Sequence, residues 1–319
     1  MKPKVSVCMP VYNCARYLPE AIESVLKQTY VDYEFVIVND ASTDNSLELI
    51  NRYAERDTRI IVCSNERNLG QAKSLNRCLA SARGEYIKFV FSDDTLTTPD
   101  ALERMVRKLE EDPEIALVAS ARYSIDQTSK ILGVLSEYAD DIIRPGKAVI
   151  TDCLFTLTNK VGEPTAVMFR KKLSSRGFNE SYNQNVDWEM WFYLLEQGKF
   201  AYIHAPLCSF RTHPDQQTNL NRIKQIHLTE PFALMRDYAD KPYIALTACE
   251  KQYMLFLPAL AVWKASMPYH KITLSDSFLK IRDHCGVCRF VFHYPMYKAY
   301  RMYMSAMKRV KRVLSKKPS

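Results

Sequence analysis

Three aspartates stand directly after apolar, strand-like runs of the sequence. Asp40 follows the run 34–38, and Asp93 and Asp94 follow the run 86–91. Because ligands of an open parallel sheet bind beyond the carboxyl ends of its strands, we expect these carboxylates at one edge. Converging carboxylates repel one another unless a cation lies among them, and hard oxygen ligands suit Mg²⁺ or Mn²⁺ shared with phosphate oxygens. The pattern predicts a metal–nucleotide site, although each aspartate alone is equally explained as a turn former or helix cap.

Other candidate residues lie at element ends farther along the chain. Asp187 begins a predicted helix over 187–197, where it is either a general base or a helix cap, and Glu189 is the alternative base. Arg211 and His213 follow the last predicted strand in a polar loop, where a surface role explains them equally well. Asp44, by contrast, is explained by capping its helix and by a favourable interaction with the helix dipole.

The glycine pattern excludes two common nucleotide-binding motifs. The chain has 8 glycines, and none precedes Gly70. Both motifs require glycine, so the first βαβ unit contains neither the Rossmann fingerprint nor a P-loop. Lys73, in the first helical turn after Gly70, either reaches a phosphate or is a solvated surface lysine.

The elements that must position these residues follow from the periodicity of the apolar residues. Short β-rich runs alternate with helix-spaced runs, which predicts an α/β fold whose mostly parallel sheet is covered on both faces. The predicted strands are 5–9, 34–38, 59–63, 86–91, 116–119, 165–169 and 200–203. The predicted helices are 18–26, one capped near Ser42, 72–82 closed by Gly84, one with Thr98 as N-cap and Pro99 at its first position, and 187–197. Strand signals stop near residue 220, which predicts domains 1–219 and 220–319.

Taken together, these segments resemble the glycosyltransferase family 2 enzymes of the GT-A fold. The resemblance covers about residues 4–219 and rests on motifs in matching order and spacing. The motifs are Pro10-Val11-Tyr12-Asn13, Val38-Asn39-Asp40-Ala41-Ser42-Thr43-Asp44, Asn68-Leu69-Gly70 with Asn76, Gly84-Glu85-Tyr86-Ile87, Ser92-Asp93-Asp94, Gly162-Glu163-Pro164-Thr165, Asp187-Trp188-Glu189 and Arg211-Thr212-His213. The resemblance implies a Rossmann-like GT-A domain followed by a C-terminal helical appendage that it does not cover.

The resemblance also implies roles at the matching positions. The expected donor-binding residues are Pro10, Val11, Tyr12, Asn13, Asp40, Lys73 and Asp93. The expected ligands of Mn²⁺ or Mg²⁺ are Asp93, Asp94 and His213, and the expected acceptor or diphosphate contacts are Glu189, Arg211 and His213. Asp187 matches the catalytic base, which takes the proton of an acceptor hydroxyl as that oxygen attacks the anomeric carbon and inverts it.

Two positions depart from the family pattern. Phe91 stands where many members have the first Asp of the D-x-D metal motif, and Asn39 replaces a frequent Asp. The metal shell must then depend on Asp93, His213, the diphosphate and water. We therefore expect weak metal affinity in the absence of donor.

The expected function is sugar transfer from a nucleotide-diphosphate sugar, taken as a UDP-sugar, to a hydroxyl of a glycan or lipid-linked acceptor in lipopolysaccharide or capsule assembly. One alternative is a catalytically idle membrane-surface binding module of the same fold, prompted by Phe91 and a basic tail. A sugar nucleotidyltransferase is disfavoured because it would carry a glycine-rich loop where this chain has residues 10–13.

The positive charge of the chain is concentrated at its C-terminus. The net charge is +8, and residues 284–319 hold nine Lys or Arg and no acidic residue. A predicted helix over 295–319 places apolar residues on one stripe and basic residues off it, which is typical of binding to an anionic membrane surface. Docking on the body, or a homodimer through the C-terminal helices, explains the same stripe equally well. Nucleic acid is not an expected partner.

The remaining features indicate a cytoplasmic protein, with the tail attaching it to the inner face of the cytoplasmic membrane. Nine scattered cysteines are typical of reduced thiols, and Cys285-Gly-Val-Cys288 alone supplies too few ligands for structural zinc. We expect no signal peptide, because the first strand begins near residue 4. The longest apolar run, 253–263, is too short to span a membrane.

Overall fold

The computed structural model describes residues 2–223, 226–244, 246, 250–251 and 254. The chain divides into two compact units, one of residues 1–153 and 158–230 and the other of residues 154–157 and 231–319. Every candidate site residue lies in the first unit. The predicted tail helix over 295–319 and the cysteine pair at 285 and 288 lie outside the described residues.

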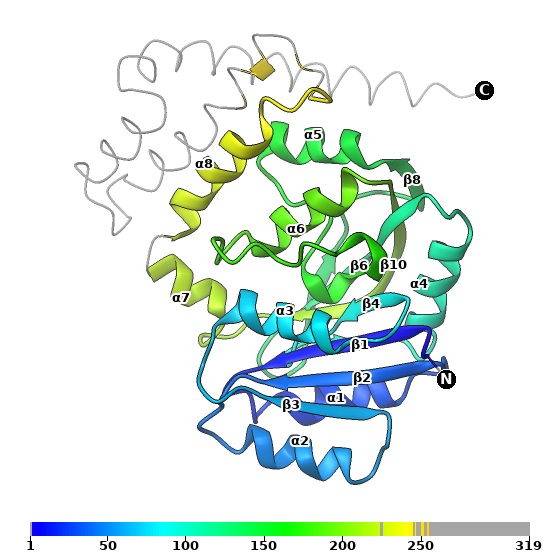
Figure 1. Cartoon of the computed structure of the whole chain (residues 1–319), viewed down its shortest axis with the longest axis vertical. Helices are drawn as coiled ribbons and strands as arrows, with labels where there is room; N and C mark the ends of the chain where they lie inside the picture. The colour runs from blue at the N-terminus through cyan, green and yellow to red at the C-terminus, as the bar shows by residue number, and fades with distance from the viewer. Residues whose placement is uncertain (1, 224–225, 245, 247–249, 252–253, 255–319) are drawn as a thin grey trace. The chain divides into compact units, whose positions relative to one another are not determined.

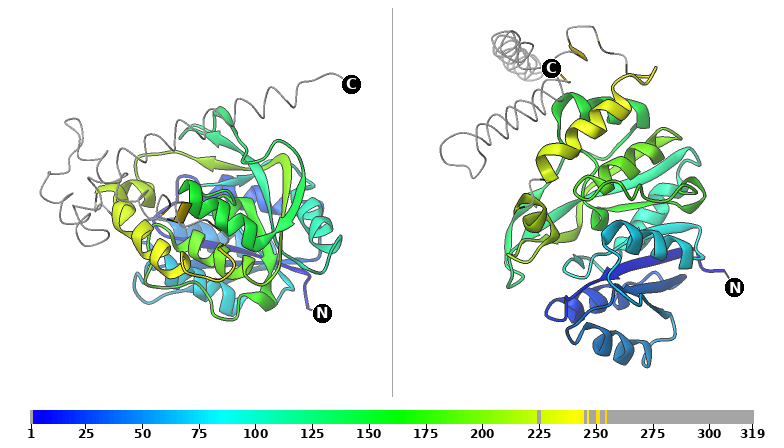
Figure 2. Two further views of the ribbon diagram at one scale, coloured as in Figure 1. Left: turned by 90° about the horizontal axis from the view of Figure 1, so that it is seen from above. Right: turned by 60° about the vertical axis from the view of Figure 1, so that its left-hand side comes forward.

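A ten-stranded sheet forms the centre of the first unit (Figures 1 and 2). Its main path runs β3-β2-β1-β4-β9-β6-β10-β5, with β7 beside β6 and β8 beside β10. The strands are β1 (Val5–Val11), β2 (Tyr33–Asn39), β3 (Ile60–Ser64), β4 (Tyr86–Phe89), β5 (Thr95–Leu96), β6 (Ile115–Ile125), β7 (Ile131–Leu135), β8 (Ile142–Pro145), β9 (Val167–Arg170) and β10 (Lys199–Arg211). Strands β1 to β4 are parallel to one another, as are β6 and β10, whereas β9 runs antiparallel between β4 and β6. The predicted mostly parallel α/β fold is confirmed.

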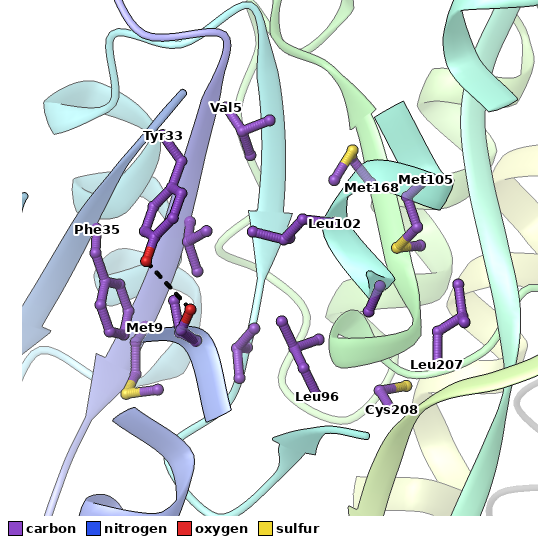
Figure 3. Packing of buried hydrophobic residues seen from close by; sticks show 14 of the residues in the cluster. Val5, Met9, Tyr33, Phe35, Leu96, Leu102, Met105, Met168, Leu207 and Cys208 are labelled. Carbon is purple, nitrogen blue, oxygen red and sulfur yellow. Dashed lines mark hydrogen bonds between the residues drawn. The ribbon is translucent and has the colours of Figure 1, made fainter. Parts of the chain in front are cut away.

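Helices lie on both faces of this sheet. The helices of the described residues are α1 (Leu18–Leu26), α2 (Ser46–Ala54), α3 (Gln71–Ser81), α4 (Ala101–Glu110), α5 (Gly146–Thr156), α6 (Val186–Leu195), α7 (Gln217–Ile223) and α8 (Ile226–Tyr238), of which α1 to α4 and α6 contact the sheet. Side chains alternate across a strand, so Val5 and Met9 of β1 join one buried cluster with apolar residues of α1 and α4 (Figure 3). Cys8 points the other way, toward the Cys78 carbonyl of α3. Among the described residues, no helix has the length and apolar character that a membrane span requires.

Two predicted helix starts are wrong. The helix expected to be capped near Ser42 begins at Ser46, because Ala41 takes a φ of 55° and the chain turns before the helix can form. Asp44 then accepts the Ser46 backbone N–H at 3.0 Å, which is the helix-start role expected of it. The helix expected to begin at Pro99 begins at Ala101, because the Pro99 carbonyl accepts a hydrogen bond from Thr29 instead.

The end of α3 also differs from the prediction. The helix stops at Ser81 rather than at Gly84, and Gly84 has another role. A Cβ added at Gly84 would lie 2.5 Å from the backbone nitrogen of Ser6, so only glycine lets this segment approach β1.

Several strands are longer than predicted or were not predicted. Strands β6 and β10 continue to Ile125 and Arg211, because their parallel pairing persists where the sequence turns polar. Strand β7 is exposed along its whole length, so it lacks the alternation that marks a half-buried strand. Strands β5 and β8 are too short for a periodic signal, and α5 was also missed. The extended pairing of β6 with β10 places Arg211 at the end of β10, and His213 follows in the next loop.

Candidate active site

The loops that follow β1 and β2 are tied together at the sheet edge. Asn13, in the left-handed region at φ 48°, accepts the Thr43 backbone N–H at 2.7 Å through its side-chain oxygen. Asp44 accepts the backbone N–H of Ala15 at 3.0 Å. Of the four residues expected at the donor base, Val11 is buried, Pro10 is partly buried, Asn13 is exposed, and the Tyr12 side chain is half exposed. The contacts between the two loops therefore fix the exposed Tyr12 and Asn13 beside the end of β1.

Asp40 lies buried at the end of β2. One carboxylate oxygen accepts hydrogen bonds from the Asn65 amide at 2.6 Å and the Leu69 backbone N–H at 2.8 Å, and the other accepts the Gly70 backbone N–H at 3.0 Å. Asp40 therefore fixes the loop that leads into α3. Lys73 follows in the first turn of α3 with an exposed side chain.

Asp93 and Asp94 lie in different environments although they are adjacent. The carboxyl of Asp94 is buried, where it accepts the Thr165 hydroxyl at 2.6 Å and the Arg211 backbone N–H at 2.9 Å. Burial, and then the charge of Asp93, raise the pKa of Asp94 well above its usual range. The Asp93 side chain is 22% exposed, and one of its oxygens lies 3.1 Å from His213 Nε2. Of the two carboxyls, that of Asp93 is the one that a ligand could reach.

His213 and Arg211 complete the surroundings of Asp93. The His213 ring packs against Tyr17, with ring centroids 4.8 Å apart. The buried Arg211 guanidinium donates to the Asp93 carbonyl at 2.6 Å, the Ser129 hydroxyl at 2.9 Å and the Glu20 carboxylate at 2.7 Å. Since the donors of Arg211 are engaged inside the protein, it holds the Asp93 segment in place rather than facing substrate.

Asp187 lies in the first turn of α6, after Asn185 as the N-cap residue. Its side chain is half-buried, and the surrounding protein raises its pKa to about 7. Burial is the main cause, the negative charges of Glu163 and Glu230 act in the same direction, and a hydrogen bond from the Trp188 backbone N–H opposes them. A carboxyl that titrates near neutral pH can take up a proton during a reaction.

The alternative base, Glu189, is held in an ion pair. Its two oxygens accept hydrogen bonds from the Arg176 guanidinium, each at 2.6 Å, and the carboxylate is buried. An acceptor hydroxyl could reach these oxygens only by displacing the Arg176 guanidinium. Of the two acidic residues of the motif, Asp187 has the environment of a base.

The loop of residues 162–165 connects the Asp93 region with α6. Thr165 donates to Asp94, and the Gly162 carbonyl accepts the Trp191 indole N–H of α6 at 3.0 Å. Glu163 between them raises the pKa of both Asp94 and Asp187. The buried ammonium of Lys88 donates a hydrogen bond to the Thr165 carbonyl. Burial lowers the pKa of Lys88 to about 8. Sequence patterns gave no role to Lys88, because its contacts are distant in the chain.

The residues at Asp93 fit part of a divalent metal site. Two ligands at right angles on a cation, about 2.1 Å from each, lie about 3 Å apart, which is the spacing of the Asp93 oxygen and His213 Nε2. Within the described part of the chain, no three His, Cys, Asp or Glu side chains gather as a metal cluster. The protein therefore offers two ligands there, and a bound diphosphate and water would have to complete the shell.

The sheet order and the carboxylates at its carboxyl edge define a GT-A-type α/β fold. The Staphylococcus aureus TarS 1–349 structure in complex with UDP-GlcNAc matches with a TM-score of 0.67 at 16% identity, over 94% of this chain and 92% of that one. A Pyrobaculum calidifontis mannosyltransferase structure in complex with GDP-Man and Mn²⁺ matches with a TM-score of 0.58 at 19% identity, over 99% and 89%.

The sequence comparison is more specific. Residues 6–178 match the model of the family described as glycosyl transferase family 2. An uncharacterized glycosyltransferase of Methanocaldococcus jannaschii is 31% identical over 82% of this chain and 88% of its own length. A Pasteurella multocida chondroitin synthase is 30% identical over 70% of this chain, which spans only 22% of that enzyme. This chain belongs to glycosyltransferase family 2.

Proposed function

We propose that this protein is an inverting glycosyltransferase that moves a sugar from a UDP-sugar to a hydroxyl of a glycan or lipid-linked acceptor during polysaccharide assembly. The observation that carries the proposal is the position of Asp187, a carboxyl with a pKa raised to about 7, in the first turn of α6, a helix whose Trp191 contacts the same 162–165 loop that contacts Asp94. Polysaccharide assembly is supported by the similarity to a chondroitin synthase, and a UDP-sugar by the similarity to the TarS complex with UDP-GlcNAc.

Asp187 acts as the base in this proposal. Its ionised carboxylate accepts the proton of the acceptor hydroxyl while that oxygen attacks the anomeric carbon and the bond to the nucleoside diphosphate breaks. One displacement from the face opposite the leaving group inverts the anomeric centre. The mechanism needs a single base and no covalent intermediate, so the pairing of Glu189 with Arg176 does not hinder it.

Asp93 and His213 are the residues that would hold Mn²⁺ or Mg²⁺. When bound, the cation neutralises charge that develops on the leaving diphosphate. Arg211 keeps the Asp93 backbone in position, and the packing of Tyr17 on His213 sets the direction of the imidazole. Asp94 is buried and accepts hydrogen bonds from Thr165 and Arg211, so we do not propose it as a metal ligand.

In this proposal the donor nucleotide binds beside residues Pro10 to Asn13 and Asp40. The Tyr12 side chain is exposed there and offers its ring to a base, while Asp40 shapes the loop that leads into α3. Lys73, exposed in the first turn of α3, is within the same region and is proposed to contact phosphate.

The proposal is tested with a panel of nucleotide sugars, with and without Mn²⁺. A donor that binds the folded chain raises its melting temperature by mass action, and we expect one UDP-sugar to do so only when Mn²⁺ is present. That donor should then be turned over with a glycan or lipid-linked acceptor. An idle binding module of the same fold, suggested by Phe91 in the metal motif, would give neither metal-dependent binding nor turnover.

A further inference from the structure

The turn of residues 183–185, which leads into α6, donates its backbone hydrogen bonds to a single carboxylate, that of Glu230. The backbone N–H groups of Asn183, Gln184 and Asn185 all donate to Glu230, at 2.6, 2.8 and 2.7 Å. Three successive backbone N–H groups aimed at one point form a concavity that binds an anion. Here the anion is a side chain of α8, forty-five residues from Asn185 and only 8% exposed.

The position of this turn relates it to the proposed reaction. Asn185 is the N-cap residue of α6, and Asp187 follows in the first helical turn, so the backbone that Glu230 holds determines where the Asp187 carboxylate points. A second contact restrains the same turn, because the Asn221 amide of α7 donates to the Gln184 side-chain oxygen at 3.0 Å. We propose that Glu230 is a positioning residue that fixes the 183–185 turn and thereby aims Asp187 at the acceptor hydroxyl. This inference rests on the proposed function.

The charge of Glu230 has a further effect beyond its hydrogen bonds. Together with Glu163, it makes ionisation of Asp187 less favourable, whereas the Trp188 backbone N–H favours the ionised form. The other polar neighbour of the Asp187 carboxyl is the Asn159 amide, at 3.4 Å. Removing the Glu230 charge should therefore lower the pKa of Asp187.

The test compares three full-length variants with the wild type. Glu230→Gln keeps the shape but removes the charge and puts an amide NH₂ against a backbone donor. Glu230→Asp keeps the charge but withdraws the carboxylate by one methylene, and it also serves if Glu230→Gln does not fold. Asp240→Asn is the control, since it removes an exposed carboxylate shortly after α8.

Three readouts separate positioning from simple stabilisation. In Glu230→Gln we expect faster hydrogen exchange of the 183–185 amides, a lower pKa of Asp187 by carboxyl ¹³C shifts assigned against Asp187→Asn, and a kcat lower by about ten- to a hundredfold with donor affinity unchanged. In Glu230→Asp we expect the kcat loss while the pKa stays near the wild-type value. Asp240→Asn should match the wild type in all three.

The possible outcomes are distinct. If Glu230→Gln lowers the unfolding midpoint but leaves the kcat of the folded protein and the Asp187 pKa at wild-type values, the inference is overturned. If the wild type transfers no sugar, yet the amides and the Asp187 pKa respond as described, the proposed function fails and the Glu230 contact to the turn stands.

Discussion

At the end of β4, the carboxyl of Asp93 is partly exposed beside His213, whereas that of Asp94 is buried between Thr165 and Arg211. The two adjacent residues therefore differ in what they can do. A partly exposed carboxylate with one side-chain partner is available to a ligand, while a buried carboxyl that accepts two hydrogen bonds mainly stabilises the fold. This separation leads to opposite expectations for two neighbouring substitutions.

Asp93→Ala should abolish the Mn²⁺-dependent gain in donor affinity, and because the Asp93 carboxylate has one side-chain partner, His213, it should destabilise the fold less than Asp94→Ala does. Asp94→Ala leaves the Thr165 hydroxyl and the Arg211 N–H without their acceptor and should cost about 1–3 kcal/mol for each. Calorimetric donor titration and urea unfolding measure the two quantities. Equal loss of metal-dependent binding in folded Asp93→Ala and Asp94→Ala would argue against the assignment.

The pKa of Asp187 predicts the pH dependence of transfer. Only the ionised carboxylate accepts a proton, and burial raises its pKa to about 7, so the inactive protonated form persists up to near-neutral pH. We therefore expect kcat to rise as the pH increases through about 7 and to level off above it. A carboxyl with an ordinary pKa would be active down to about pH 4. A kcat that stays constant between pH 5 and 9 would contradict the raised pKa of Asp187.

Among the elements, the approach of the segment after α3 to β1 depends on Gly84. A Cβ at this position would lie 2.5 Å from the Ser6 backbone nitrogen, so Gly84→Ala must displace one segment. We expect a loss of about 1–3 kcal/mol, measured by urea unfolding. Gly133→Ala is the matched control because no atom lies within 4 Å of its added Cβ. Equal stability of the two variants would contradict the close approach.

The central strands could be predicted because each is a short apolar run bounded by turn residues. β2 ends directly before Asp40, and β4 ends four residues before Asp93. The direction of β9 could not be predicted, since the same apolar run suits a parallel or an antiparallel neighbour. Asp40, Asp93 and Asp187 could be proposed from the sequence because strand ends and first helical turns are local features. The roles of Glu230 and Lys88 depend on contacts far along the chain, which no local pattern carries.

For the whole molecule, the distribution of charge leads to a prediction about binding to anionic lipid. Nine of the 44 basic residues lie in residues 284–319, where no acidic residue offsets them. Deleting residues 295–319 should release the protein from vesicles that contain anionic lipid, in a salt-dependent manner, while binding to neutral vesicles stays negligible. Sedimentation with vesicles measures this. Undiminished vesicle binding after the deletion would contradict the membrane role of residues 295–319. The apolar stripe of this segment would then be explained by docking on the body or by a homodimer.

The central claim is that Asp187 removes the proton of the acceptor hydroxyl, and single-turnover transfer by Asp187→Asn at saturating donor tests it most directly. We expect the rate to fall by ~10²–10⁴-fold, since a general base contributes about this much, while the calorimetric donor affinity stays at the wild-type value. Glu196→Gln, at the other end of α6, is the control and should transfer normally. Transfer by Asp187→Asn at the wild-type rate would contradict the account.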